Sequence, residues 1–171
     1  MALNTTAILS SDIVFQQQDT ESTSLDNRQG SLTYSQSLTS GTGSNNINSV
    51  YSTFSYPIGV GSGLSLDFTN LSQSIVGGSM TVPMNNLKSV IVRNSSSTTG
   101  EDILVRATGS NALTEIFNGG SGDLSVKPST TYMYSDPYTG ATINSSNKNF
   151  QILNDGTGTI SIDVIAVGVT G

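Results

Sequence analysis

The stretch NFQILNDGTGTISIDVIAVG (residues 149–168) consists of two short apolar segments joined by a polar, glycine-rich turn. In the second segment Ile160, Ile162 and Val164 alternate with polar residues, and alternate side chains of a β-strand point to opposite faces of its sheet. The intervening NDGTG holds the residue types that favour chain reversal. The stretch therefore predicts a β-hairpin with one buried face.

The same alternation recurs along the chain. It is clear in SLTYSQSL (31–38), GLSLDFTN (63–70) and EDILVRAT (101–108). The positions expected to face inward are Leu32, Tyr34, Leu38, Leu64, Leu66, Phe68, Ile103, Val105 and Ala107. Helical periodicity is confined to NALTEIF (111–117), which is too short for more than a single turn in a loop.

Two segments carry apolar residues on both faces. In LKSVIVRN (87–94) the alternation predicts Leu87 and Ile91 on one side, with Val90 and Val92 on the other. In the last strand the face that Asp163 begins continues with Ile165, Val167 and Val169. We expect such strands to lie in the middle of a sandwich or against a neighbouring subunit.

The spacing of strands and turns predicts an all-β fold. From residue 47 onward about eight strand candidates alternate with turn signals, as in two-sheet sandwiches of the jelly-roll kind. We therefore expect an antiparallel, jelly-roll-like β-sandwich over residues 47–171, preceded by an extended N-terminal arm with strand-like pieces over residues 1–46. The arm's apolar residues either add an edge strand to their own sandwich or lie across a neighbouring subunit by strand addition. These residues are Ile8, Ile13, Val14 and Phe15.

Composition argues against several functional classes. Of the 171 residues, 35% are hydrophobic and 11% charged, and the net charge is −6 with six scattered basic residues. Such a chain lacks the basic patch that binds nucleic acid or an anionic membrane surface. No apolar stretch is long enough for a membrane-spanning helix, and the N-terminal residues do not resemble a secretory signal peptide. We expect synthesis in a cytoplasm and no nucleic-acid or membrane partner.

The residue types in this chain give little support for a catalytic function. The absence of histidine and cysteine excludes serine–histidine–acid and cysteine–histidine catalysis, as well as metal sites built on those ligands. Glu101 and Asp102 are neighbours, so on a strand they point to opposite faces. Asp67 and Asp163 lie on separate predicted strands. They could serve as a glycosidase pair only if the fold brought the two carboxylates to face each other across a sugar. The acidic loops do not match a calcium-binding loop either, so we expect no catalytic residue, metal site or cofactor.

The densest aromatic segment is TYMYSDPY (131–138), with Tyr132, Tyr134 and Tyr138. Such a loop on a β-sandwich can stack on sugar rings or anchor a protein partner. Tyrosines at alternate positions can equally fill a core or a sheet edge, which is the interpretation that we favour.

The second half of the chain resembles small virion proteins encoded beside the capsid genes of tailed bacteriophages. The resemblance lies in LKSVIVRNSSSTTGEDILV, VKPSTTYMYSDP and FQILNDGTGTISIDVIAVGVTG, where the matching places are Ser89 to Asn94, Asp102 to Val105, Lys127 to Ser129 and Thr159 to Gly168. It implies a jelly-roll or related sandwich that decorates or cements a capsid, often as a trimer.

We therefore expect a structural virion protein on the capsid exterior, a homo-oligomer and most simply a trimer, whose partner is the major capsid protein. Ile8, Ile13, Val14 and Phe15 are the predicted contact residues. The main alternative is a tail-fibre or spike tip that binds host glycans through Tyr132, Tyr134 and Tyr138. A carbohydrate-active enzyme with two aspartates, or the major capsid protein of a small virus, are further alternatives. The latter would normally have a longer chain and a basic arm.

Overall fold

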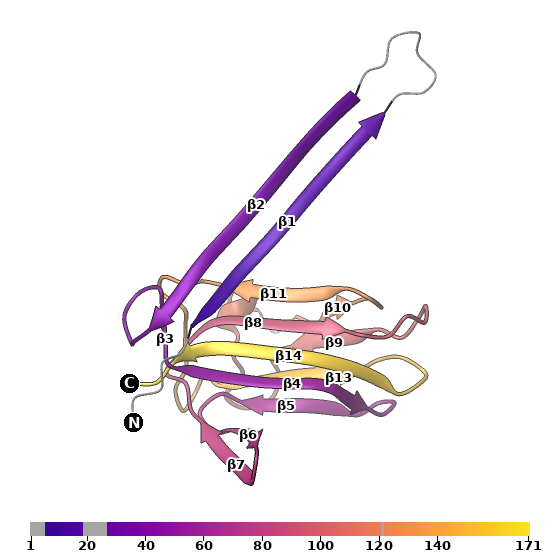
Figure 1. Ribbon diagram of the computed structural model, residues 1–171. Coiled ribbons are helices and arrows are strands. Elements are labelled where there is room, and N and C mark those ends of the chain that lie inside the picture. Colours follow the sequence, from indigo (N-terminus) through magenta and orange to yellow (C-terminus); the bar gives the residue numbers. More distant parts are fainter. Residues whose placement is uncertain (1–5, 19–26, 121) are drawn as a thin grey trace.

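The structure is a computed structural model that describes residues 6–18, 27–120 and 122–171, with backbone alone for 11–18 and 27–34. Two antiparallel sheets pack face to face, and a long β-hairpin projects from one end of the sandwich (Figure 1). No α-helix occurs among the described residues; η1 (Glu115–Phe117) is a single 3₁₀ turn, in the segment where one turn was predicted. The predicted all-β, antiparallel sandwich is confirmed.

The first sheet has the strand order β11-β8-β14-β4. Its strands are β4 (Ser49–Ile58), β8 (Asn86–Asn94), β11 (Thr131–Ser135) and β14 (Ile160–Val169). The short β12 (Ala141–Thr142) pairs with the beginning of β8.

The second sheet has the order β10-β9-β13-β5. Its strands are β5 (Gly63–Asp67), β9 (Ile103–Arg106), β10 (Leu124–Val126) and β13 (Asn149–Asn154). A separate hairpin of β6 (Leu71–Ile75) and β7 (Gly78–Val82) lies beside β4, where the Gln73 side chain accepts a hydrogen bond from the Ser52 amide.

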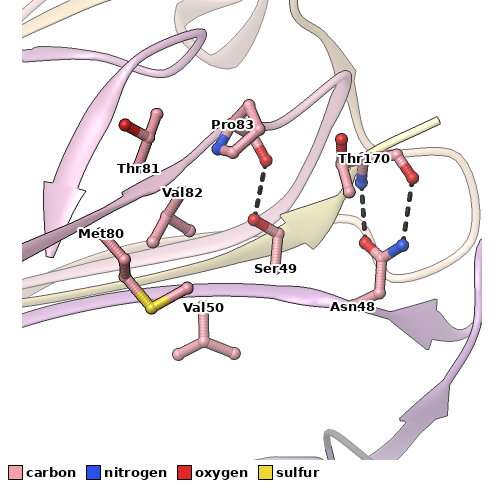
Figure 2. A pocket seen from close by; sticks show the side chains of 8 residues that line it. All are labelled: Asn48, Ser49, Val50, Met80, Thr81, Val82, Pro83 and Thr170. Carbon is pink, nitrogen blue, oxygen red and sulfur yellow. Dashed lines mark hydrogen bonds between the residues drawn. The ribbon is translucent and has the colours of Figure 1, made fainter. Parts of the chain in front are cut away.

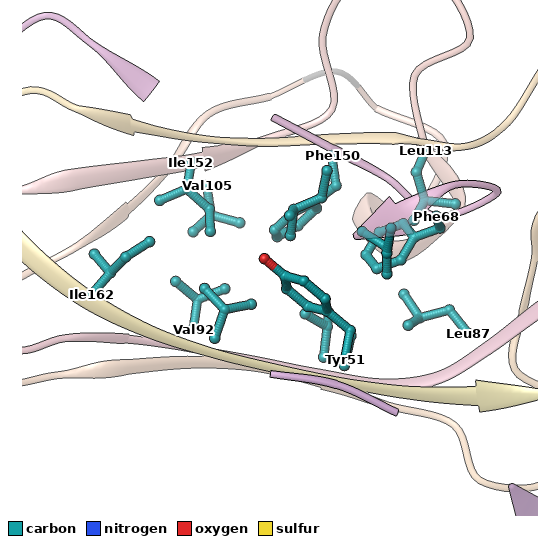
Figure 3. Packing of buried hydrophobic residues seen from close by; sticks show 14 of the residues in the cluster. Tyr51, Phe68, Leu87, Val92, Val105, Leu113, Phe150, Ile152 and Ile162 are labelled. Carbon is teal, nitrogen blue, oxygen red and sulfur yellow. The ribbon is translucent and has the colours of Figure 1, made fainter. Parts of the chain in front are cut away.

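The core lies between the two sheets and is built from alternate residues of nearly every strand (Figure 3). Leu66, Phe68, Ile103, Val105 and Ala107 are buried, as their alternation predicted. The aromatic rings of the core lie close together: the ring centroid of Phe150 lies 6.1 Å from Phe68 and 6.2 Å from Phe117. Hydrophobic burial of this kind is the main force that holds such a sandwich together.

One face assignment was wrong, and a β-bulge explains it. Leu87 is fully buried in the same core as Val90 and Val92, not on the side of Ile91. The pairing of β8 with β14 slips between Val167 and Gly168, so that β8 has one residue more than its partner at Lys88. An extra residue in one strand reverses the faces of all residues beyond it.

The N-terminal hairpin consists of β1 (Ala7–Gln18) and β2 (Asn27–Ser40), paired antiparallel along twelve residues. The end of β2 also pairs in parallel with the two-residue β3 (Asn46–Ile47). Within the described residues β1 pairs with β2 and with no strand of the sandwich, so it adds no edge strand to either sandwich sheet. The hairpin instead runs outward at a steep angle to the sheets (Figure 1).

Candidate interaction site

The hairpin rests on the outer face of β14, where its base forms a second small hydrophobic cluster, here called the foot. Leu9, Leu38 and Ile47 are buried against Val167, and Ile165 packs beside them. This contact explains why β14 is apolar on both faces: one faces the core between the sheets and the other is covered by the hairpin of the same chain.

Hydrogen bonds fix the turn that joins the foot to the sandwich. The Asn45 amide donates to the carbonyl of Pro137 at 3.0 Å, and the Gln36 side-chain amide donates to Asn45 Oδ1 at 3.0 Å. Asn46 Nδ2 donates to Thr39 Oγ1 at 2.8 Å. Asn45 has φ of 58°, a left-handed conformation that asparagine adopts more readily than most residues. The direction of the hairpin is therefore set by specific contacts.

Beyond the foot, the backbone register continues regularly: Ile13 pairs with Leu32, and Phe15 pairs with Gly30. Ile13 and Phe15 belong to the same series of alternate positions in β1 as the buried Leu9. In sequence, apolar residue types therefore continue along the hairpin beyond the foot. Among the four predicted contact residues, Ile8 is 71% exposed. The side chains of Ile13, Val14 and Phe15 lie outside the described residues.

The three tyrosines of residues 131–138 do not form one exposed surface. Tyr132 and Tyr134 alternate on β11 and pack against the core, where the Tyr132 ring stacks on Phe117 with centroids 6.0 Å apart. Burial raises the pKa of each hydroxyl to about 12, with the nearby Asp136 adding to the effect at Tyr134. Tyr132 and Tyr134 are partly buried, whereas Tyr138 is 68% exposed and is the most accessible of the three to a ligand from solvent.

A buried lysine holds the loop that carries Tyr138. Lys88 as a residue is almost completely buried, and its ammonium donates to the carbonyls of Tyr138 at 2.8 Å and Thr139 at 2.9 Å. Burial lowers the pKa of Lys88, while the nearby Asp136 acts in the opposite direction. Because the Pro137 carbonyl of this loop accepts the bond from Asn45, Lys88 also supports the foot of the hairpin indirectly.

The two aspartates considered for catalysis lie on opposite outer faces of the sandwich. Asp67 is on β5 of the second sheet and pairs with Lys148 at 2.6 Å, whereas Asp163 is on β14 of the first sheet. Partial burial of Asp67 opposes its ionisation, but hydrogen bonds from Lys148 and Thr69 outweigh it and lower the pKa. With the core between them, these carboxylates cannot act on one substrate.

The neighbouring acids Glu101 and Asp102 are each engaged in structural contacts. Glu101 is buried and accepts hydrogen bonds from Thr157 Oγ1 and the Gly158 amide, while Asp102 pairs with Lys127. Within the described part of the chain, no three acidic side chains come together as a metal site, and no helix has the length and apolar character needed to cross a bilayer.

A further surface that sequence reasoning missed is the β4 edge, formed by β4 and the β6–β7 hairpin. Eleven large hydrophobic side chains are exposed among the described residues, and six of them belong to this edge. They are Val50, Phe54, Tyr56, Ile75, Val76 and Met80. One signal was available in the sequence, because residues 31–66 and 68–87 contain no charged residue.

The β4 edge also contains a hollow of about 320 Å³ (Figure 2). Val50, Met80, Val82 and Pro83 supply its apolar lining, together with Asn48, Ser49, Thr81 and Thr170. We call it the Val50 hollow.

No protein-family model, curated protein sequence or solved structure matches this chain, so the site has to be interpreted from its own geometry.

Proposed function

We propose that the protein is a structural virion protein that binds the outer surface of a phage capsid and stabilises it, as a decoration or cement protein. On this proposal the hairpin beyond its foot contacts the major capsid protein. The observation that carries the proposal is the hairpin itself: β1 and β2 pair along twelve residues, and among the described side chains those that pack on the sandwich lie at its base.

A projecting two-stranded ribbon needs a partner for physical reasons. At about 3.3 Å per residue, β1 extends roughly 40 Å, and an isolated two-stranded hairpin is marginally stable in water. Past the foot, the outer edge of each strand pairs with no other strand among the described residues. Unpaired edges accept added strands from another protein, and the register positions of Ile13, Phe15 and Leu32 offer apolar residue types for the same contact.

The path of the chain supports the jelly-roll part of the proposal. The two sheet orders, β11-β8-β14-β4 and β10-β9-β13-β5, divide eight strands equally. Among these eight strands the chain changes sheet at every step except from β9 to β10. Eight strands arranged in this way are typical of jelly rolls, a fold that recurs in viral capsid proteins.

Surface chemistry agrees with a structural role. The chain is poor in charge and rich in serine, threonine and asparagine, which offer hydrogen bonds without the cost of desolvating ions. Interfaces that rely on such groups and on bridging water need not be weak. The glycan-binding alternative, a tail-fibre or spike tip, is left with Tyr138 because Tyr132 and Tyr134 pack against the core, and it therefore ranks second.

The test is co-sedimentation of the purified full chain with empty capsid shells of the virus. The matched variant replaces residues 13–32 by Asn-Gly, which closes a tight turn between Asp12 and Thr33, a pair that already stands in register. It keeps Leu9, Leu38 and Ile47, so the foot remains. We expect the wild type to bind shells and the shortened variant to fold with the same unfolding midpoint but not bind.

Tyr138→Ala serves as the control for the alternative. It should bind shells as the wild type does, because Tyr138 lies outside the hairpin. Shell binding by the shortened variant at wild-type affinity would contradict the role of the hairpin. Failure of the wild type to bind shells, together with glycan binding that Tyr138→Ala abolishes, would replace the proposal by the tail-tip function.

A further inference from the structure

We propose that the β4 edge binds a second copy of the same chain, with the turn at Ile75 and Val76 of one copy seated in the Val50 hollow of the other. This inference concerns a surface away from the hairpin and goes beyond capsid binding. It is testable on the protein alone.

The first observation is a protruding apolar turn. Val76 has a relative exposure of 105% and Ile75 of 50%, at the tip of the β6–β7 hairpin. Gly77 has φ of 89°, a left-handed conformation that favours glycine and closes the turn tightly. Two adjacent β-branched side chains at a turn tip contribute little to their own fold when they are this exposed, which points to burial against another molecule.

The second observation is that the Val50 hollow suits an apolar side chain. The side chains of Asn48 and Ser49 in its lining are already paired within the chain: Asn48 accepts from the Thr170 amide at 2.7 Å and donates to the Thr170 carbonyl at 3.0 Å (Figure 2). Ser49 Oγ donates to the Pro83 carbonyl at 2.7 Å. An incoming apolar group therefore displaces water without stranding these polar groups.

The size of the hollow agrees with this occupant. It measures about 320 Å³ and is open to solvent. A closed apolar cavity of about 150 Å³ accepts a benzene molecule, so the hollow has room for the branched side chains of Ile75 and Val76.

The absence of charge at this edge, and the presence of both the turn and the hollow on one chain, favour a second copy as the partner. Each chain has a net charge of −6, so two copies repel wherever their acidic faces approach. Both strands of the β6–β7 hairpin and the whole of β4 are free of charged residues, and this edge therefore lets copies approach with little repulsion. The turn and the hollow also lie on the same edge of one chain, so two identical copies supply both halves of the contact.

The turn and the hollow are different parts of the edge, and this constrains the assembly. Contacts between unlike surfaces close into a ring when the rotation allows it, whereas two copies that exchange turns reciprocally form a dimer. Either arrangement brings Val76 of one copy next to Met80 of another. Phe54, which is 62% exposed, belongs to the same edge.

The experiment is sedimentation equilibrium of the full chain over a range of concentrations, with Val76→Asp as the variant. Since Val76 is fully exposed, the substitution should leave the unfolding midpoint unchanged. We expect the wild type to self-associate and Val76→Asp to raise the dissociation constant at least tenfold, on the order of the loss expected for an interface anchor. The matched control is Val60→Asp, an exposed valine in the turn after β4, which should associate as the wild type does.

A cross-link tests the contact itself, because the chain contains no cysteine. Under oxidising conditions a mixture of Val76→Cys and Met80→Cys single variants should form a disulfide-linked dimer, whereas Val76→Cys mixed with Val60→Cys should not. A monomeric wild type, or equal association of Val76→Asp and wild type, would overturn the proposal. So would a monomeric wild type whose binding to shells is lost in Val76→Asp, since the edge would then belong to the capsid contact.

Discussion

The carboxylate of Asp163 accepts a hydrogen bond from the backbone amide of Ser55 on the neighbouring strand, at 2.8 Å. This bond lies where β4 has one residue more than β14, since the pairing slips between Ile162 and Val164. Ser55 has φ of 51°, in the left-handed region. The aspartate that the sequence offered as a catalytic candidate thus stabilises a β-bulge.

Removal of this carboxylate should weaken the fold. Asp163→Ala leaves the Ser55 amide without its acceptor, and we expect the free energy of unfolding to fall by about 1–2 kcal/mol. Adding Ser55→Gly should restore part of the loss, because glycine adopts a positive φ without strain. Urea unfolding measures both effects. Asp155→Ala, at an exposed aspartate in the turn after β13, is the control, and an equal loss in both single variants would contradict the role of the bulge.

The turn between β13 and β14 closes directly on Glu101. A Cβ added at Gly156 would lie 2.9 Å from Glu101 Cα, and the Gly156 amide donates to Asn154 Oδ1 at 2.8 Å. We expect Gly156→Ala to lower the free energy of unfolding by about 1–3 kcal/mol, since buried backbone has to shift. In Gly122→Ala the added Cβ meets no atom within 4 Å, so its thermal midpoint should match that of the wild type.

Alternation along strands predicted most of the core, because the period of two is a local property of extended backbone. Leu66 on β5 and Phe68 directly after it, and Ile103 and Val105 on β9, are buried as expected. The face of Leu87 was missed because the bulge at Lys88 arises from the pairing with β14, which no local pattern records. The burial of Lys88 was equally invisible to local patterns, because the carbonyls that accept hydrogen bonds from its ammonium lie about fifty residues away in sequence.

The candidate site was predicted in part. The apolar residues at both faces of β14 indicated a second contact, and the sequence left open a sandwich interior or a neighbouring subunit. The structure instead places Leu38 and Ile47 of the same chain on Val167. The β4 edge was missed because single exposed apolar residues look ordinary in sequence, and only the fold brings Val50 and Met80 to one hollow.

The buried tyrosines predict how stability changes at alkaline pH. The pKa of Tyr132 and of Tyr134 is about 12 in the folded protein, above the ordinary value of about 10. The unfolded chain therefore loses these protons first, so stability is complete below about pH 10 and decreases as the pH rises towards 12. In the double variant Tyr132→Phe, Tyr134→Phe this decrease should be smaller, because the rings still pack and have no proton to lose. Urea unfolding between pH 8 and about 11.5 measures it, and a decrease as steep as in the wild type would contradict the assignment.

The foot and the main core should respond separately to mutation, because they are separate hydrophobic clusters on opposite faces of β14. Leu38→Ala removes a fully buried side chain, a change that costs about 2–5 kcal/mol where the surroundings cannot close the cavity. The loss should be confined to the hairpin: hydrogen exchange of amides in the foot, such as that of Thr39, should accelerate, while β9 and β13 stay protected. Ile152→Ala, which empties an equally buried position in the main core, is the matched control and should accelerate exchange throughout the sandwich. If Leu38→Ala instead lowered protection in β9 and β13 as much as Ile152→Ala does, the hairpin and the sandwich would unfold as one unit, and the foot would be an integral part of the core.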